Sequence, residues 1–172
     1  MESSTNYIHP TAIIYDNVVM GENNYIGAYC IIGAPAEHKG NWGQTNDIVV
    51  IGDNNVFTGM VTIDGGMDDV TYIGDNNFFL KHTHLGHDCQ VMDNVIVSCG
   101  AKIGGHTILD NNVNIGLNAV IHQRQFIAKG CMIGMGAVVT KRLVTEPYTK
   151  YAGNPAKYLS HNEGSNSSSR LS

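Results

Sequence analysis

Histidine residues are concentrated in one part of this sequence. The chain of 172 residues has eight histidines, and five of them lie within a stretch of about forty residues: His82, His84, His87, His106 and His122. An unperturbed imidazole has a pKa of about 6.5, so it can accept or donate a proton at neutral pH, and it is also a common metal ligand. A single exposed histidine is usually an ordinary surface residue, so the question is whether the fold brings several of them together.

A period of six residues runs through the same stretch and indicates how the chain folds. Large apolar residues stand at every sixth position: Ile73, Phe79, Leu85, Val91, Val97, Ile103, Leu109, Ile115, Ile121, Ile127, Ile133 and Val139. Neither an α-helix nor a β-strand has this period. Hexapeptide repeats are typical of a parallel β-helix, in which each unit forms one wall of a three-sided prism. We therefore expect eighteen residues per coil, with the large residues pointing inward.

The same period defines the extent of the domain. It begins near residue 8 and is interrupted by residues 34–49, which contain Pro, Gly, Asn and the only Trp and therefore read as a loop. It stops near residue 140, and residues 140–159 lead the chain out of the prism. The tail 160–172 is rich in Ser and Asn and is predicted to be disordered. We expect a single all-β domain over residues 1–159.

The coil length predicts where the histidines lie. With eighteen residues per coil, His87 stacks beneath Gly105, and His106 and His122 fall on neighbouring columns of the next two coils. Such a corner would hold a base next to an exposed backbone N–H. The flanking residues are also polar: Asp88, Gln123 and Arg124. Because several titratable and polar groups share one corner, we favour a functional site over a chance grouping.

The β-helix and the composition limit the possible partners. A prism filled by its own side chains has no internal cavity, so a pocket must form between prisms, and we expect a homotrimer with the histidines in the groove between two subunits. The net charge of −5 argues against nucleic acid as a partner. No apolar run approaches the ~20 residues that span a membrane. The four cysteines have no CxxC spacing and fit reduced thiols in a cytoplasmic protein.

The histidine segments closely resemble the UDP-N-acetylglucosamine acyltransferases of lipid A synthesis. The resemblance rests on His84-Leu-Gly-His87-Asp-Cys, on Gly105-His106 and on Ala119-Val-Ile-His122-Gln123. It extends from His9-Pro-Thr-Ala-Ile to Pro147-Tyr148 and Gly153-Asn154. It implies a left-handed parallel β-helix and a homotrimer, whereas the usual preference for right-handed crossovers would predict the other hand.

The resemblance also implies a role for particular residues. His87 would be the general base, and Gly105 would supply an oxyanion-hole N–H, while Asp88 or another carboxylate could orient the imidazole. Contacts with the nucleotide-sugar acceptor would come from His84, His106, His122 and Gln123, and from Glu37, His38 and Lys39 in the loop. Since the base activates the acceptor directly, no Ser or Cys nucleophile is required.

The expected acyl donor follows from a second resemblance. In that family a helical domain follows the β-helix, and we expect no counterpart of it here. The exit Ala152-Gly-Asn-Pro-Ala-Lys157 instead resembles the end of the hexapeptide sugar acetyltransferases, which lies along coenzyme A. We therefore expect acyl-CoA as donor, with acyl carrier protein as the alternative, and an amino or hydroxyl group of a nucleotide sugar as acceptor, in the synthesis of a lipopolysaccharide or O-antigen. The donor would contact Gly134, Ala137, Lys141, Arg142, Gly153, Asn154 and Lys157.

Three alternatives remain open at this point. The first is a long-chain UDP-N-acetylglucosamine O-acyltransferase of lipid A synthesis. The second is a zinc enzyme similar to the γ-class carbonic anhydrases, with His82 and His87 as ligands, whereas the acyltransferase interpretation needs no metal. The third is a β-helix scaffold without catalytic activity, which would leave the histidine motifs unexplained.

Overall fold

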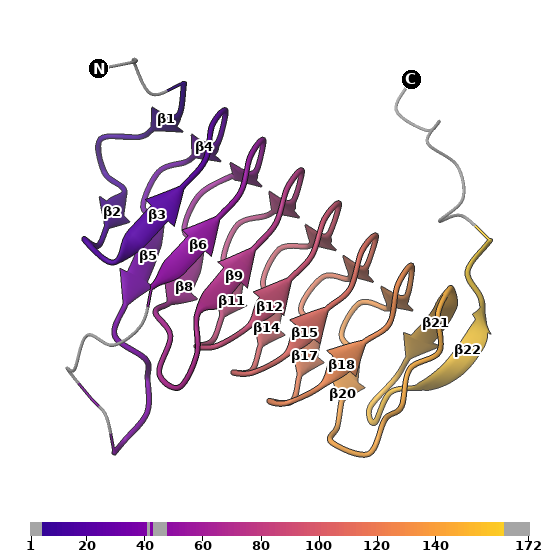
Figure 1. Cartoon of the computed structure of the whole chain (residues 1–172). Coiled ribbons are helices and arrows are strands. Elements are labelled where there is room, and N and C mark those ends of the chain that lie inside the picture. The colour runs from indigo at the N-terminus through magenta and orange to yellow at the C-terminus, as the bar shows by residue number, and fades with distance from the viewer. Residues whose placement is uncertain (1–4, 41, 43–47, 164–172) are drawn as a thin grey trace.

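The chain winds into coils of short β-strands that stack along one axis. The computed structural model describes residues 5–40, 42 and 48–163. Figure 1 shows the strands advancing coil by coil from β1 at the N-terminal end to β21 and β22 at the C-terminal end. The coils form a left-handed parallel β-helix, as the resemblance implied.

The coils contribute strands to three sheets, which we call sheets A, B and C; the last coil, with β19 and β20, adds a strand to sheets A and B only. Sheet A contains β1 (Tyr7–Ile8), β4 (Tyr25–Ile26), β7 (Val56–Phe57), β10 (Phe78–Phe79), β13 (Ile96–Val97), β16 (Asn114–Ile115), β19 (Met132–Ile133), β21 (Thr149–Ala152) and β22 (Lys157–His161). Sheet B contains β2 (Ile13–Ile14), β5 (Ile31–Ala34), β8 (Thr62–Asp64), β11 (His84–Leu85), β14 (Lys102–Ile103), β17 (Val120–Ile121) and β20 (Val138–Val139). Sheet C contains β3 (Val18–Met20), β6 (Val49–Ile51), β9 (Thr71–Ile73), β12 (Gln90–Val91), β15 (Ile108–Leu109) and β18 (Phe126–Ile127).

The register of the sheets confirms the predicted coil length. His84 pairs with Lys102, and Lys102 pairs with Val120, so these steps along sheet B advance eighteen residues each, whereas the two steps that contain excursions are longer. All twelve large residues of the sixfold pattern, from Ile73 to Val139, point into the prism and are at most 2% exposed. The first coil differs, because no coil covers it among the described residues, and Ile8 is 45% exposed.

The corners of the prism contain residues in the left-handed backbone region. At the corner between sheets C and A these positions are mostly Asn, as at Asn76 and Asn94, which tolerate this conformation because their side chains bond locally. At the corner between sheets B and C they are Asp88, His106 and Arg124, with φ of 58°, 57° and 61°. A column of large or charged residues at positive φ is uncommon, and such positions are frequent at functional sites.

Two excursions interrupt the coils. The long one runs between β5 and β6 over residues 35–48, one residue shorter at each end than the predicted loop 34–49, because Ala34 and Val49 join strands. The short one, residues 65–70, links β8 to β9. Both leave the prism at the same side, which places them beside the corner between sheets B and C.

The C-terminal exit is a hairpin rather than an extended arm. β21 continues sheet A in parallel with β19, and β22 folds back antiparallel to β21. The strand β22 reaches His161, two residues into the predicted tail, while residues 164–172 of that tail lie outside the described residues. Within the described part of the chain, no helix is long and apolar enough to cross a membrane.

Candidate active site

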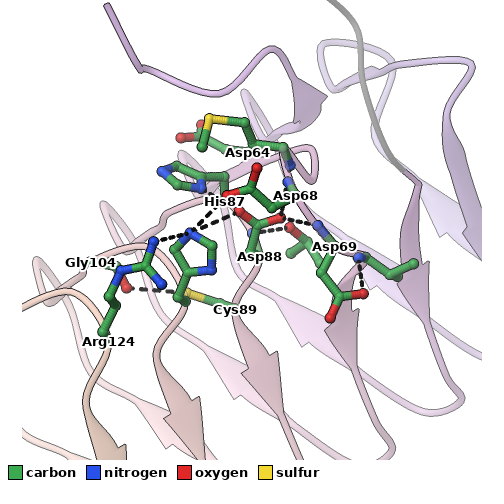
Figure 2. Close-up of polar contacts among 12 residues, drawn as sticks. Asp64, Asp68, Asp69, His87, Asp88, Cys89, Gly104 and Arg124 are labelled. Atoms are coloured by element: carbon green, nitrogen blue, oxygen red, sulfur yellow. Dashed lines mark hydrogen bonds and ion pairs between the residues drawn. The ribbon is translucent and has the colours of Figure 1, made fainter. Parts of the chain in front are cut away.

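The candidate site lies at the corner between sheets B and C, which comprises residues 86–89, 104–107 and 122–125 and which we call the B–C corner. His87 and Asp88 follow β11 directly, and their side chains meet (Figure 2). The Nδ1 atom of His87 lies 2.6 Å from Oδ2 of Asp88. Because an ionised carboxylate can only accept hydrogen bonds, Nδ1 carries the proton and Nε2 is left as the basic nitrogen.

Asp88 is held by the short excursion of the chain. Its other oxygen, Oδ1, accepts hydrogen bonds from the backbone N–H groups of Met67, Asp68 and Asp69 at 2.7, 3.1 and 2.8 Å. Burial alone would raise the pKa of Asp88, but the hydrogen bonds from His87 and from these backbone groups outweigh it and lower the pKa. The carboxylate is therefore ionised and fixed, as a residue that orients a catalytic imidazole must be.

Gly105 lies against the basic nitrogen of His87. A Cβ atom at Gly105 would stand 2.8 Å from Nε2 of His87, so a larger residue would displace the ring. The neighbouring N–H of His106 is bonded to the carbonyl of His87 at 2.9 Å, whereas the N–H of Gly105 has no acceptor among the described residues. The structure thus confirms the predicted position of Gly105 over His87.

His106 extends the polar cluster to the next coil. Its ring packs edge to face on His87 with the centroids 5.1 Å apart, and its Nε2 lies 3.2 Å from Oδ2 of Asp88. Arg124, one coil further, places Nη2 at 3.1 Å from the same nitrogen. Asp68 contributes a second carboxylate at 3.6 Å. The cluster therefore combines carboxylates, imidazoles and one guanidinium.

The positions of the histidines can also be compared with those that a zinc enzyme would need. His82 and His87 lie at opposite ends of β11, at different corners of the prism, so they do not form the expected ligand pair. Ligand atoms of His87, Asp88 and His106 do lie within 4.8 Å of one another. However, Asp88 already binds His87, and the Arg124 guanidinium beside His106 would repel a metal cation.

His84 belongs to the neighbouring column and faces a pocket rather than the cluster. Its Nδ1 is 2.9 Å from Oγ1 of Thr62, and its Nε2 is 3.9 Å from Oδ2 of Asp64. Asp64 is 5% exposed, and burial raises its pKa, although His84 and the backbone N–H of Glu37 act in the opposite direction. His84 and Asp64 thus form a second polar pair beside His87.

The loop residues predicted to contact the acceptor lie near this part of the molecule. His38 packs edge to face on His87 with ring centroids 6.3 Å apart, and its Nδ1 accepts a hydrogen bond from the N–H of Gly40. Glu37 lines the pocket that contains Asp64. Lys39 is exposed in the same segment. The loop therefore brings His38 and Glu37 to the site.

His122 and Gln123 lie on the same corner but one coil beyond His106, and both side chains are exposed. The Nδ1 atom of His122 donates to the carbonyl of Gln123 at 2.9 Å, which leaves its Nε2 as an acceptor. Their roles as acceptor contacts stay predictions.

The residues predicted to bind coenzyme A are spread over the core, the hairpin and the exposed exit segment. Ala137 is fully buried in the core, and the N–H of Gly134 is bonded to the carbonyl of Tyr151. Gly153 and Asn154 make the turn of the hairpin, and Lys157 opens β22 opposite Ala152. Lys141 and Arg142 are exposed beyond β20. The sequence Ala152 to Lys157 forms the turn of this hairpin, and the turn needs a glycine at position 153, where φ is 97°.

Sequence reasoning missed two residues of the site, Asp64 and Asp68, and assigned no role to a third, Arg124. Asp64 was not selected as a candidate site residue because it precedes an irregular excursion. Beyond that point, counting eighteen residues per coil no longer gives the position of a residue. Asp68 lies within that excursion. Arg124 was noticed only as a neighbour of Gln123, although its spacing of eighteen from His106 was a usable signal.

Comparison with known proteins identifies similar sequences. A family model described as bacterial transferase hexapeptide (six repeats) matches residues 71–105. The chain is 30% identical over 142 residues to an acyl-[acyl-carrier-protein]–UDP-N-acetylglucosamine O-acyltransferase of Helicobacter pylori, covering 83% of this chain and 42% of that protein. It is 33% identical over 142 residues to the protein of the same name from Burkholderia orbicola, covering 80% of this chain and 53% of that protein. The chain thus spans about half the length of these relatives.

A solved structure agrees with these matches. The UDP-N-acetylglucosamine acyltransferase of Bacteroides fragilis superimposes with a TM-score of 0.79 at 27% sequence identity, covering 94% of this chain and 75% of that one. Since the relatives are named for transfer from acyl carrier protein, the expectation of acyl-CoA as donor is wrong. The six-residue resemblance on which it rested, Ala152 to Lys157, reflects the hairpin turn described above.

Proposed function

Because the chain is a hexapeptide-repeat β-helix protein that is similar to UDP-N-acetylglucosamine O-acyltransferases in sequence and in fold, we propose that it is an acyltransferase. It transfers an acyl group from acyl carrier protein to a hydroxyl group of a nucleotide sugar. This is the first of the alternatives set out from the sequence, without a commitment to the length of the acyl chain. Of the two acceptor groups considered from the sequence, amino and hydroxyl, we choose the hydroxyl because the relatives are named as O-acyltransferases.

The observation that carries the proposal is the arrangement of His87 between Asp88 and Gly105. Asp88 holds the proton on Nδ1, so Nε2 is free to accept the proton of the acceptor hydroxyl. The oxygen of that hydroxyl attacks the carbonyl carbon of the thioester, and a C–O bond forms. The N–H of Gly105, which has no acceptor among the described residues, stabilises the oxyanion.

The second half of the reaction returns the proton. When the tetrahedral intermediate collapses, the C–S bond breaks and the thiolate of the carrier leaves. The imidazolium of His87 donates its proton to that sulfur, which restores the neutral base. Asp88 stabilises the imidazolium during this cycle through the 2.6 Å hydrogen bond. No covalent enzyme intermediate is required.

We also propose that the protein is a trimer, as the resemblance implies. A three-fold ring joins two different surfaces of each chain. One such surface is an apolar column on the outer face of sheet A, where Tyr25, Phe78 and Ile96 stack in register and are 43%, 38% and 41% exposed. Contiguous exposed apolar residues of this kind mark contact sites.

The test is a direct assay of thioester transfer. The purified chain is incubated with acyl-[acyl-carrier-protein] and UDP-N-acetylglucosamine, and release of the carrier thiol is followed together with formation of the acylated sugar. We expect thiol release that depends on the sugar and is lost in the His87→Ala variant. Equal thiol release with and without the sugar would contradict the proposal, since that would indicate hydrolysis.

A further inference from the structure

The B–C corner contains one guanidinium, that of Arg124, and the register of the coils places it beside His106. The two residues occupy equivalent corner positions of successive coils, with φ of 57° at His106 and 61° at Arg124. Their backbone N–H groups donate to the carbonyls of His87 and Gly105 in the preceding coil, each at 2.9 Å. Figure 2 shows Arg124 reaching toward the polar cluster from the side of Gly104.

The contact between the two side chains has a direction. The Nη2 atom of Arg124 lies 3.1 Å from Nε2 of His106. A guanidinium can only donate hydrogen bonds, so Nε2 of His106 is the acceptor and carries no proton. The ring of His106 makes no other hydrogen bond among the described residues. His106 is therefore a neutral imidazole with its proton on Nδ1.

Two carboxylates approach the same nitrogen of His106. The Oδ2 atom of Asp88 lies 3.2 Å from Nε2, and Oδ2 of Asp68 lies 3.6 Å from it. Either carboxylate could accept a hydrogen bond from Nε2 only if that nitrogen carried a proton, and Nε2 could then no longer accept one from Arg124. The bond from Arg124 and a bond to a carboxylate thus exclude each other, and the structure contains the first.

This choice matters for the base, because Oδ2 of Asp88 is the atom that holds the proton on Nδ1 of His87. A protonated His106 would donate to that oxygen, and its charge would lie in a ring whose centroid is 5.1 Å from that of His87. Two like charges so close would oppose the imidazolium that forms on His87. The other titratable groups that face these rings are Asp68, in the short excursion, and His38, in the long one.

We propose that Arg124 is a positioning residue of the site. It keeps His106 neutral, with the proton on Nδ1, and so reserves Oδ2 of Asp88 for His87. The inference rests on the proposed function, and it adds a residue that acts through its neighbour rather than on the substrate. Two other roles for an exposed arginine are a surface charge without effect on the reaction and a contact with a phosphate of a substrate, and the experiments separate them from this one.

The ring nitrogens of His106 report its protonation directly. In protein with isotope-labelled histidine, their NMR chemical shifts distinguish the two neutral tautomers from the charged ring, and the signals of His106 are those missing from His106→Gln. We expect the unaltered protein to show a neutral ring with its proton on Nδ1 near neutral pH. Arg124→Met should give a charged ring or a proton on Nε2. Either of these states in the unaltered protein would overturn the inference.

Turnover should depend on Arg124 where an imidazole can become charged. Near pH 6, below the ordinary imidazole pKa of about 6.5, we expect kcat of Arg124→Met to be roughly 10-fold or more below that of the unaltered protein. Near pH 8 the two should agree, and KM for the sugar nucleotide should be unchanged throughout. Arg124→Lys keeps a cationic donor and should restore part of the loss.

The matched control is Lys81→Met, which removes an exposed cation between β10 and β11, at another corner of the prism, and should keep the unaltered pH profile. A loss of kcat in Arg124→Met that is equal at every pH would indicate a merely structural role and overturn the inference. A raised KM for the sugar nucleotide or the acyl carrier, with kcat unchanged, would overturn it as well and assign Arg124 to a substrate phosphate.

The NMR measurement needs no substrate, so it separates this inference from the proposed function. If Arg124→Met changes the protonation of His106 but acyl-[acyl-carrier-protein] is not consumed by the unaltered protein, the proposed function fails and the control of the His106 proton stands. If acyl transfer occurs and Arg124→Met leaves both the ring nitrogens and the pH profile unchanged, the inference fails and the proposed function stands.

Discussion

The Nδ1 atom of His87 lies 2.6 Å from Oδ2 of Asp88, and the opposite ring nitrogen faces Gly105. This relationship assigns the two nitrogens different tasks, because the carboxylate keeps the proton on one of them and leaves the other basic. Asp88 is in turn fixed by three backbone N–H groups of the short excursion. The catalytic proposal can therefore be tested one contact at a time.

Replacing the base should lower turnover more than it lowers binding. We expect His87→Ala to reduce kcat by roughly 10²–10⁴, the usual contribution of general base catalysis, while trimer formation and acceptor affinity are retained. His122→Ala and Gln123→Ala should instead raise KM for the acceptor and retain more turnover. If His84→Ala abolishes turnover while His87→Ala retains most of it, the base is His84.

Asp88 should make stability depend on pH in the acidic range. Its pKa is lowered from the ordinary value of 3.8, so its ionised form stabilises the fold above that pH, and this contribution is lost as the pH falls below it. We expect Asp88→Asn to cost about 1.5–3 kcal/mol at neutral pH, as for hydrogen bonds to a charged group. Urea unfolding of both proteins should show the difference shrinking as the pH falls through 3.8. A difference that is constant with pH would contradict this account.

A methyl group at Gly105 should disturb catalysis rather than folding. Its Cβ would stand 2.8 Å from Nε2 of His87, so the ring must move, and a displacement of about 1 Å can cost roughly 10²-fold in rate. Gly136→Ala is the control, because Gly136 has a φ of 64° with open space around it and lies away from the B–C corner. That control should lose stability and keep its turnover. Equal losses of turnover in both variants would point to a general effect.

Thiol reagents should leave the proposed acyl transfer intact. Burial raises the pKa of Cys89 to about 12, and its thiol lies 3.3 Å from the carbonyl of Gly104, so it is neither ionised nor accessible near neutral pH. Cys30 and Cys131 are also buried, and burial raises the pKa of each. We expect iodoacetamide to modify Cys99 alone, without loss of acyl transfer. Inactivation in proportion to labelling would indicate a thiol in the mechanism.

The trimer can be tested on the outer face of sheet A. Light scattering at micromolar concentration should return the mass of three chains. Ile96→Asp, which places a charge in the apolar column, should shift the protein toward monomers, whereas Lys102→Asp on sheet B serves as a control on an exposed position. A monomeric unaltered protein would contradict both the trimer and a site shared between subunits.

The sequence was sufficient to predict the prism and the contact of Gly105 with His87. Both follow from a repeat of six that is strict from Ile73 to Val139, so that counting residues gives positions in space. The resemblance of the histidine segments then supplied roles that counting cannot provide.

The partners of His87 and His84 were harder to predict because they depend on irregular segments. The N–H groups that hold Asp88 come from residues 67–69, which have no place in the repeat. Asp64 ends β8 just before that excursion, and its carboxylate accepts a hydrogen bond from the backbone of the loop residue Glu37. At the other end, the short exit motif suggested an arm along the coils, whereas pairing of β22 with β21 folds it back.

The register of eighteen residues per coil has a consequence for engineering. Each coil contacts only the coils next to it, so the protein behaves as a stack of nearly independent layers. Duplicating one regular coil between His122 and the C-terminal hairpin should lengthen the molecule by a single strand spacing, about 4.8 Å, and leave the B–C corner unaltered. The separation between the candidate active site and the C-terminal end can thus be adjusted in whole coils, each about one strand spacing long.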